Sequence, residues 1–350
     1  MSDKIEHICV MGLGYIGLPT ASILATKGYK VTGVDVSPKV VDTINEGRIH
    51  IVEPDLDILV KSAVNSGNLT ASLSPVPADV FIIAVPTPFK EGKKADLSYV
   101  AAASRAIALH VKRGDLVILE STSQPGTTEE IVATELDAAG HNTTEDIFVA
   151  HCPERVLPGR ILIELIENDR VVGGISEAST QKAVAFYESF VRGEVLSITA
   201  KTAELVKLTE NSYRDVNIAF ANEISMIADA EGVNTWEVIS LANRHPRVNI
   251  LNPGPGVGGH CITVDPWFIV DRSPQYSRLI RTAREVNDSK PEWVLSRVRA
   301  KAAKFRDPVI GCLGLAFKAD VDDLRESPAH EIVKHIQSKG IGRVQCVSRI

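Results

Sequence analysis

Cys261 ends a glycine-rich segment, residues 254–261 (GPGVGGHC), and the carboxylate of Asp265 follows four positions later. Four glycines in six positions allow a backbone to approach a ligand closely and to adopt positive φ. A cysteine held in such a segment lies near main-chain N–H groups, which stabilise a thiolate and any oxyanion formed beside it. The alternative is a tight turn followed by a buried cysteine. The glycine density and the nearby carboxylate favour Cys261 as a nucleophile.

A second pattern, G-x-G-x-x-G, is formed by Gly12, Gly14 and Gly17. It follows an apolar strand pattern, opens a helical pattern and precedes Asp35 by about 20 residues, as in dinucleotide-binding folds. Gly12 and Gly14 would let the backbone meet a pyrophosphate, and Gly17 would let the helix pack on the sheet. Asp35 would accept hydrogen bonds from a ribose and repel a 2′-phosphate, which favours NAD over NADP. A chance glycine turn is the weaker alternative.

Two further sets of polar residues could line a cleft. Thr87 and Thr122 each follow a predicted strand, where open α/β sheets bind ligands, so their hydroxyls could bond the nicotinamide half of a cofactor or a catalytic water. A turn cap is an equally good explanation. Lys207, Asn211 and Arg214 share one face of a predicted helix. For this set, a cleft-lining role and a solvated face both remain open.

Additional cations occur at residues 243–247 (NRHPR), Lys318 and Arg325. Arginine and lysine side chains suit phosphate oxygens. For each of these cationic residues considered alone, a surface salt bridge is the more common role.

The composition bounds the class of protein. The chain has 350 residues, of which 44% are hydrophobic and 23% charged, and its net charge is −6. We expect a globular protein with no nucleic-acid partner, because there is no long basic run. We also expect no membrane segment, because no stretch reaches the roughly 18 apolar residues of a span. The five cysteines are scattered, which favours free thiols in a reducing cytoplasm over disulfides or a metal site.

The elements that must position these residues can be read from the periodicity. Strand patterns at residues 8–11, 31–35, 80–85 and 116–120 alternate with helical ones, which predicts an α/β fold with a Rossmann-type, doubly wound parallel sheet over residues 1–201. Residues 202–304 are predicted to form a central domain with long helices at about 202–243 and 277–303, which would join domains or make a dimer face.

A third domain is predicted to begin at residue 305. Its strand, helix and strand, at about residues 309–314, 327–338 and 344–347, start a second α/β domain. One strand–helix–strand unit cannot bury both faces of its sheet, so we expect residues 305–350 to form an incomplete nucleotide-binding domain.

Together these segments resemble the nucleotide-sugar 6-dehydrogenases, the family of UDP-glucose, GDP-mannose and UDP-N-acetylmannosamine dehydrogenases. The resemblance runs through all 350 positions. Residues 203–211 (AELVKLTEN) are similar to the family at large. Residues 49–54 (IHIVEP), 151–159 (HCPERVLPG) and 243–249 (NRHPRVN) are similar to the members that act on UDP-N-acetyl-D-mannosamine.

The resemblance implies a four-electron oxidation of UDP-N-acetyl-D-mannosamine to UDP-N-acetyl-D-mannosaminuronate with two NAD, for surface polysaccharide synthesis. The Cys261 thiolate would add to an aldehyde, giving a thiohemiacetal and then a thioester that water hydrolyses. Lys207, helped by Asn211, would stabilise the oxyanion or move protons. The other implied catalytic residues would position water or transfer a proton, and they are Asp265, Thr122 and Glu154.

The same resemblance assigns binding residues. The cofactor would be held by Gly12, Gly14, Tyr15, Ile16, Gly17, Asp35, Thr87 and Thr122. The sugar nucleotide would be held by Arg155, Val156, Lys207, Asn211, Arg214, His245, Arg247, Gly258, Lys318 and Arg325. Of these, Arg247 would reach the neighbouring subunit's site in a homodimer.

Two alternatives remain open. The substrate could be UDP-glucose, and NADH formation with each sugar nucleotide would separate the two. The chain could also be a truncated, catalytically weak NAD-binding dimer, because family members continue beyond the last strand and complete the domain that covers the uridine. On that view NAD binding would survive and sugar-nucleotide affinity would be poor.

Overall fold

The computed structural model describes residues 5–259, 261–317, 324 and 326–347. The chain forms two compact units, Met1–Lys207 and Leu208–Ile350. The predicted division into three domains, with boundaries after residues 201 and 304, stays a prediction.

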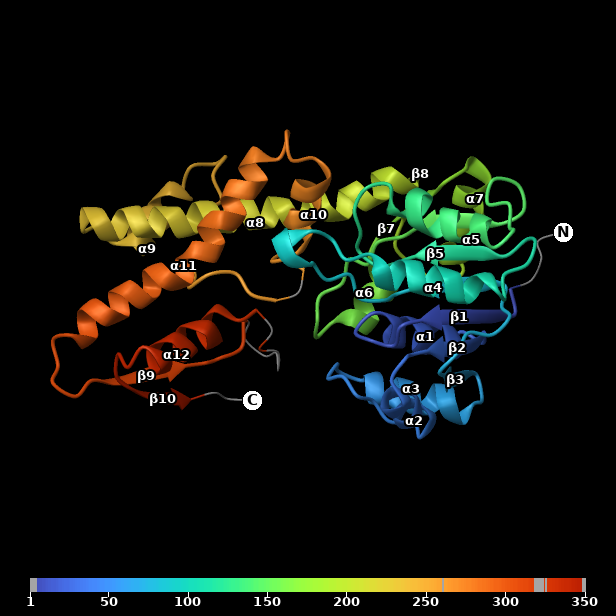
Figure 1. Ribbon diagram of the computed structural model, residues 1–350, viewed down its shortest axis with the longest axis horizontal. Coiled ribbons are helices and arrows are strands. Elements are labelled where there is room, and N and C mark those ends of the chain that lie inside the picture. Colours follow the sequence, from blue (N-terminus) through green and yellow to red (C-terminus); the bar gives the residue numbers. More distant parts are fainter. Residues whose placement is uncertain (1–4, 260, 318–323, 325, 348–350) are drawn as a thin grey trace. The chain divides into compact units, whose positions relative to one another are not determined.

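The first unit alternates strands and helices along the chain (Figure 1). Its elements are β1 (His7–Met11), α1 (Gly17–Thr26), β2 (Lys30–Val34), α2 (Pro38–Asn45), α3 (Leu56–Asn65), β3 (Leu69–Ser72), β4 (Val80–Ile83), η1 (Glu91–Lys93), α4 (Ser98–Ala108), β5 (Leu116–Leu119), η2 (Thr128–Ala133), α5 (Thr134–Ala138), β6 (Phe148–His151), α6 (Ile161–Glu167), β7 (Arg170–Gly174), α7 (Glu177–Glu188) and β8 (Val195–Thr199).

The eight strands form one sheet in the order β3-β2-β1-β4-β5-β6-β7-β8. The first six strands of this order, β3 to β6, pair in parallel and have the order of a Rossmann fold, as predicted. β7 pairs with β6 in the antiparallel sense, and β8 follows β7 in parallel, so two strands depart from the predicted parallel sheet. A strand buried on both faces has the same apolar pattern in either direction, so the sequence did not predict this reversal.

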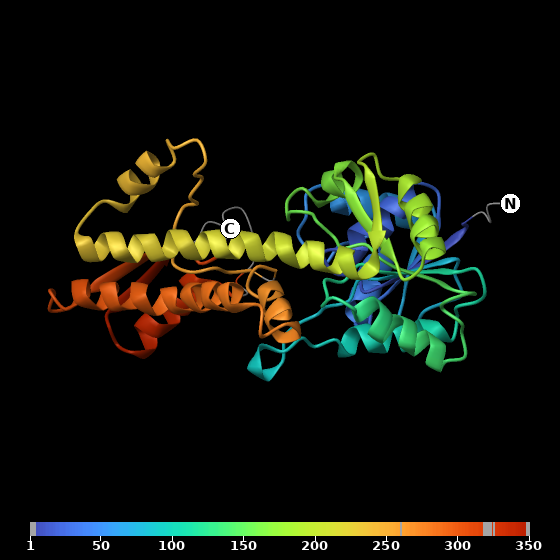
Figure 2. The ribbon, with the colours of Figure 1, turned by 90° about the horizontal axis from the view of Figure 1, so that it is seen from above.

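Alternate residues of each central strand enter two separate cores. On β1, Ile8 and Val10 face a core built with α1, α3, α6 and α7. Cys9 and Met11 face the opposite core, built with α4, η2 and α5. The sheet therefore lies between two helix layers (Figure 2), and sheets covered in this way bind ligands at the carboxyl ends of their strands.

The second unit is built on long helices. Its elements are the greater part of α8 (Ala200–Glu231), then α9 (Thr235–Ala242), α10 (Asp265–Arg272), α11 (Arg278–Ala302), β9 (Val309–Leu313), α12 (Pro328–Ser338) and β10 (Arg343–Val347). β9 and β10 form a parallel pair, and α12 packs against α11 through Leu295, Ile332 and Ile336. The strand–helix–strand order predicted for this segment is confirmed.

The long helix predicted for residues 202–243 is broken. α8 ends at Glu231 because Gly232 adopts a left-handed φ of 70°. α9 then begins with Asn234 as its N-cap, whose side chain accepts a hydrogen bond of 2.9 Å from the Trp236 N–H. The apolar periodicity continues across the break, so periodicity alone predicted one helix.

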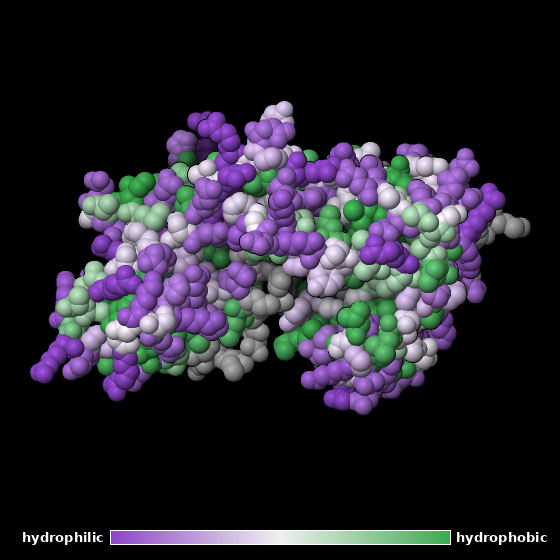
Figure 3. Space-filling model, viewed as in Figure 1, coloured by the Kyte–Doolittle hydropathy of each residue, from purple (hydrophilic) through white to green (hydrophobic). Residues whose placement is uncertain are grey.

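Polar and apolar residues are distributed as follows over the helices and the surface. In the part of the chain that the structure describes, no helix has both the length and the apolar character needed to cross a bilayer. The face seen in Figure 3 is mostly hydrophilic, with apolar side chains scattered over it.

Candidate active site

The first group of predicted residues lies where β1 and β4 meet, at the topological switch point of the sheet. Gly12 has a φ of 92°, and a Cβ on it would lie 2.5 Å from the Ala84 carbonyl oxygen. A Cβ on Gly17 would lie 1.8 Å from the Gly12 carbonyl oxygen. Both glycines are therefore required by packing. Gly14 differs, because no atom lies within 4 Å of its Cβ position, which leaves open space for a ligand.

The surroundings of this turn fit a dinucleotide. α1 starts at Gly17 without a side-chain cap, so the positive end of its dipole faces this turn, although the Leu18 N–H donates to the Gly14 carbonyl at 3.2 Å. Asp35 accepts the Leu13 N–H at 3.1 Å and the Ser37 N–H at 2.9 Å, which fixes its carboxylate beside the turn. Tyr15 and Ile16 are half-buried next to Gly14. The open space at Gly14, the uncapped helix and the carboxylate suit a pyrophosphate and a ribose.

Thr87 and Thr122 are half-buried in the loops after the neighbouring strands β4 and β5. Ser121, which the sequence analysis did not single out, joins these loops by donating a hydrogen bond of 2.7 Å to the Val85 carbonyl. In the sequence, the position of Ser121 directly after an apolar strand could have indicated it. The four parallel strands β1, β4, β5 and β6 therefore carry predicted residues at one edge of the sheet.

Glu154 lies in the loop after β6 and is buried. One of its oxygens, Oε2, lies 2.7 Å from the Arg170 guanidinium, and the other, Oε1, accepts the Arg155 N–H at 2.6 Å. Arg170 is itself 2% exposed and also donates to the Leu165 carbonyl at 2.9 Å. The sequence analysis missed Arg170. A basic residue at the start of an apolar strand could have indicated it.

A second carboxyl group is buried at the end of β5. Glu120 accepts a hydrogen bond of 2.7 Å from the Tyr187 hydroxyl of α7. Burial, followed by repulsion from Glu154, raises the pKa of Glu120 to about 7. This group directly precedes Ser121 and Thr122, so it supports the loop that carries the predicted cofactor contact.

The second group of predicted residues lies in the second unit, apart from Lys207, the last residue of the first unit. The Cys261 side chain is exposed, and its carbonyl accepts the Val264 and Asp265 N–H groups at 3.1 and 2.8 Å, which starts α10. Asp265 is 4% exposed and accepts a hydrogen bond of 2.5 Å from Asn211 of α8. Lys207 lies one turn before Asn211 on the same helix and is half-buried.

Burial separates the cysteines. It raises the pKa of Cys9 to about 11 and that of Cys152 to about 12, so neither is suited to act as a thiolate. Burial also raises the pKa of Cys312, whose neighbour across the β9–β10 pair is the exposed Cys346. Cys261 is the exposed cysteine that lies beside a carboxylate–amide pair.

Three of the glycines before Cys261 lie close to other atoms of the protein. A Cβ on Gly258 would lie 2.5 Å from Phe317 Cβ, and one on Gly259 would lie 2.9 Å from the Phe317 ring. A Cβ on Gly256 would lie 3.0 Å from Pro328. These glycines let the segment pack closely on its own protein, and the predicted contact of Gly258 with the sugar nucleotide stays a prediction.

The remaining predicted residues are proposed sugar-nucleotide contacts, and among them Arg155 is joined to Glu154 through its backbone N–H. Val156 and Arg155 are half-buried after β6, and Arg155 also donates to the Asp169 carbonyl at 3.3 Å. Three predicted residues are exposed, namely Arg214, His245 and Arg247. Lys318 and Arg325 lie outside the described residues. Among the residues that are described, no cluster of acidic, histidine and cysteine side chains could hold a metal ion, so no metal site is assigned.

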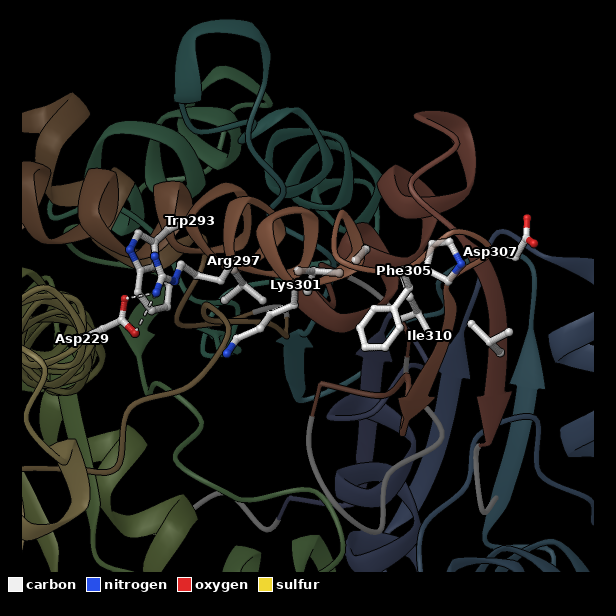
Figure 4. A pocket seen from close by; sticks show the side chains of 12 residues that line it. Asp229, Trp293, Arg297, Lys301, Phe305, Asp307 and Ile310 are labelled. Atoms are coloured by element: carbon white, nitrogen blue, oxygen red, sulfur yellow. Dashed lines mark hydrogen bonds and ion pairs between the residues drawn. The ribbon is translucent and has the colours of Figure 1, made fainter.

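One cavity of about 570 Å³ lies elsewhere in the second unit (Figure 4). Trp293, Arg297 and Lys301 of α11 line it together with Phe305 and Ile310. It contains none of the predicted site residues, so it takes no part in the site.

Comparison with protein families gives three matches along the chain. Residues 6–191 match the NAD-binding domain of the UDP-glucose/GDP-mannose dehydrogenase family, residues 201–289 its central domain and residues 311–347 its UDP-binding domain.

Individual relatives agree with these matches. An NDP-N-acetyl-D-galactosaminuronic acid dehydrogenase of Ralstonia nicotianae is 61% identical over 97% of this chain and 82% of its own length. A UDP-N-acetyl-D-mannosamine dehydrogenase of Campylobacter jejuni is 54% identical over 99% of this chain and 87% of its own. The solved UDP-N-acetyl-mannosamine dehydrogenase Cap5O of Staphylococcus aureus is 42% identical, with a TM-score of 0.92 over 99% of this chain and 84% of its own. The chain therefore belongs to the UDP-glucose/GDP-mannose dehydrogenase family and is an NAD-dependent UDP-sugar dehydrogenase.

Proposed function

We propose that the protein oxidises the primary alcohol of UDP-N-acetyl-D-mannosamine to a carboxylate through a covalent bond to Cys261. The observation that carries this proposal is the exposed Cys261 thiol at the start of α10, with Asp265 held by Asn211 in the same turn region. The relatives named for N-acetylmannosamine support the choice of sugar.

The proposed chemistry requires two oxidations and one covalent adduct. When bound, NAD⁺ accepts a hydride from the sugar, once from the alcohol and once from the aldehyde stage. Cys261 adds as a thiolate to the aldehyde carbon, and the resulting thiohemiacetal is oxidised to a thioester. Water then cleaves the C–S bond, which releases the carboxylate and regenerates the thiol.

The polar residues would act on the charges that develop. Lys207 and Asn211 would stabilise the oxyanion of the thiohemiacetal, because a cation and an amide donor lie one turn apart on α8. Asp265 and Thr122 would position the water, and Glu154 is a further candidate for proton transfer. The cofactor would be held by the turn around Gly14 and by Asp35.

A steady-state assay with UDP-N-acetyl-D-mannosamine and NAD tests this function directly. We expect two NADH per sugar from the wild-type chain and no carboxylate from Cys261→Ala. Cys9→Ala is the matched control, because Cys9 is buried in the sheet core and its loss should leave turnover largely intact. Full turnover by Cys261→Ala would rule out the thioester mechanism.

N-acetylgalactosamine is the second candidate sugar, because the Ralstonia relative named for N-acetylgalactosaminuronic acid is 61% identical. The assay is therefore run in parallel with UDP-N-acetyl-D-mannosamine, UDP-N-acetyl-D-galactosamine and UDP-glucose. The proposal requires the highest kcat/KM with the first of these. A higher kcat/KM with either of the other two sugar nucleotides would change the proposed substrate and leave the proposed mechanism at Cys261 unaffected. Use of the product in surface polysaccharide synthesis remains a prediction.

We also propose that the enzyme is a homodimer formed through α8 and α9. Tyr213, Phe220 and Ile227 are exposed at seven-residue spacing, so they form one apolar stripe along α8. Trp236 and Leu241 extend the exposed apolar surface onto α9. Arg247 follows α9 and is exposed, in keeping with the predicted contact to a neighbouring subunit. A cytoplasmic location is proposed from the five free cysteines.

A further inference from the structure

Five polar side chains are buried between α8 and α11, although the proposed chemistry uses none of them. They are Asp215, Asn222, Arg284, Asn287 and Lys290, and each is at most 2% exposed. The two helices run alongside each other in this unit (Figure 2). Burying so many polar groups is costly unless their hydrogen bonds are made, so their arrangement calls for a reason.

The five side chains form one continuous hydrogen-bonded string. Asp215 Oδ1 accepts from Arg284 at 2.5 Å and from Asn287 Nδ2 at 2.8 Å. Asn287 Oδ1 in turn accepts from Asn222 Nδ2 at 2.8 Å. Lys290 closes the string by donating to the Asn222 carbonyl at 3.1 Å. The spacing of seven residues on α8 and three on α11 places each set on a single helix face.

Both ends of the cysteine segment are attached to this string. Asn222 Oδ1 accepts the Gly254 N–H at 2.8 Å, at the start of the glycine-rich segment. Arg284 donates to the Ile262 carbonyl at 3.5 Å, directly after Cys261. Pro291 of α11 supports the middle of the segment, 3.2 Å from the Cβ position of Gly256.

The orientation of the Asn222 amide is also determined by the string. Its Nδ2 group donates to Asn287, so its Oδ1 atom is the one left to accept from Gly254. Asn287 is in turn oriented because its own Nδ2 group donates to Asp215. Turning the Asn222 amide would break both hydrogen bonds at once, at a side chain that is 0% exposed.

We propose that Asn222 and Asn287 are positioning residues that hold the Cys261 segment in its reactive geometry. This inference rests on the proposed function, since it assigns the string a purpose only if Cys261 is the reacting group. The string binds the backbone on both sides of Cys261, at Gly254 and at Ile262, so it holds the turn that carries the thiol. A displacement of about 1 Å at a reacting atom costs up to about a hundredfold in rate.

The test compares three variants. In Asn222→Ala the Gly254 N–H loses its acceptor, so we expect kcat to fall about tenfold or more while KM for the sugar nucleotide changes less than about threefold. Asn222→Asp retains an oxygen for Gly254 and should recover most of that loss. Lys290→Met is the matched control, because Lys290 is equally buried and its described hydrogen bonds go to Asn222 and Ser225 of α8, so kcat should stay near wild type.

A second readout does not depend on turnover. The rate of alkylation of Cys261 by iodoacetamide is followed by peptide mass spectrometry, with the exposed Cys346 as the internal reference. We expect Asn222→Ala to change the Cys261 rate by about threefold or more and to leave the Cys346 rate unchanged. If Asn222→Ala does not fold, Asn287→Ala, which frees the Asn222 amide to turn, should shift both readouts in the same direction.

The outcomes separate the two proposals. If Cys261→Ala abolishes turnover but Asn222→Ala matches wild type in kcat and in alkylation, the positioning proposal is wrong and the proposed function stands. If Asn222→Asp is as impaired as Asn222→Ala, the acceptor for Gly254 is not the cause, and the proposal is again wrong. If Cys261→Ala retains full turnover, the proposed function fails, and the alkylation rates alone decide whether the string holds the segment.

Discussion

At the residue scale, the three glycines of the G-x-G-x-x-G turn divide into two that packing requires and one that leaves room for a ligand. Gly12 and Gly17 have protein atoms where a Cβ would lie, whereas the space at Gly14 is open. The G-x-G-x-x-G pattern treats all three alike, although only one of them faces space that a pyrophosphate could fill. The distinction can be tested because the two kinds of glycine should fail in different ways.

We predict that Gly14→Ala folds normally and binds NAD at least about tenfold more weakly, because its Cβ would occupy the space proposed for the pyrophosphate. Gly17→Ala should instead be destabilised by more than about 2 kcal/mol, because its Cβ would overlap the Gly12 carbonyl. Thermal melting and calorimetric NAD titration measure the two effects. A Gly14→Ala chain with wild-type NAD affinity would show that the cofactor lies elsewhere.

At the scale of elements, the carboxyl edge of the sheet is held together by buried polar contacts. Ser121 joins the loops after β4 and β5, Arg170 of β7 holds Glu154 after β6, and Tyr187 of α7 holds Glu120 at the end of β5. The antiparallel strand β7 thus contributes a cation to an edge that the parallel strands build. These contacts explain why the reversed strand matters for the site.

Glu120 makes the stability of this edge depend on pH. An unfolded glutamate loses its proton near pH 4.5, whereas the folded group keeps it to about pH 7. Between these values the folded state binds more protons, so the stability of the wild type falls as the pH rises. Glu120→Gln removes this dependence, and its stability relative to the wild type should increase by about 2 kcal/mol between pH 4.5 and pH 8.

Melting temperatures of both proteins across this pH range measure the effect. Glu129→Gln, on an exposed position of η2, serves as the control for a surface carboxylate. A constant difference in melting temperature between Glu120→Gln and wild type would show that Glu120 keeps the same protonation state in the folded and unfolded chains. An offset at all pH values is expected, because the glutamine amide has one more buried group to satisfy.

At the scale of the whole molecule, the apolar stripe on α8, formed by Tyr213, Phe220 and Ile227, remains exposed in the folded chain. Tyr213, Phe220 and Ile227 are each at least 50% exposed, and Trp236 of α9 is 59% exposed. Apolar surface of this extent on regular helices is typical of a protein–protein interface. This surface therefore supports the proposed dimer independently of the resemblance of the chain to its family.

We predict that Phe220→Glu and Trp236→Glu each weaken the dimer by about a hundredfold or more, because a charge would be buried at the interface. Light scattering after size-exclusion chromatography reports the change as a dimer that becomes a monomer. Leu109→Glu is the control, since Leu109 is 84% exposed in the first unit, far from these helices along the chain. Dimers that persist in both variants would place the interface on another surface.

The sequence alone determined the features that depend on local spacing. The strand-turn-helix at residues 7–26 followed from an apolar run and three glycines, because these residues restrict the backbone over a few positions. The pairing of Asn211 with Asp265 was not readable in this way, although each residue was chosen for its chemistry. Cys261 stood out because its neighbours in sequence are unusual.

The tertiary structure decided the features that depend on residues far apart in the chain. The direction of β7, the ion pair of Arg170 with Glu154 and the string from Arg284 to Asn222 each join segments that the sequence separates. Asp215, a charged residue of α8, is fully buried and paired with Arg284 of α11. Local periodicity states which face of a helix is polar, but only packing decides whether that face meets water or another polar helix.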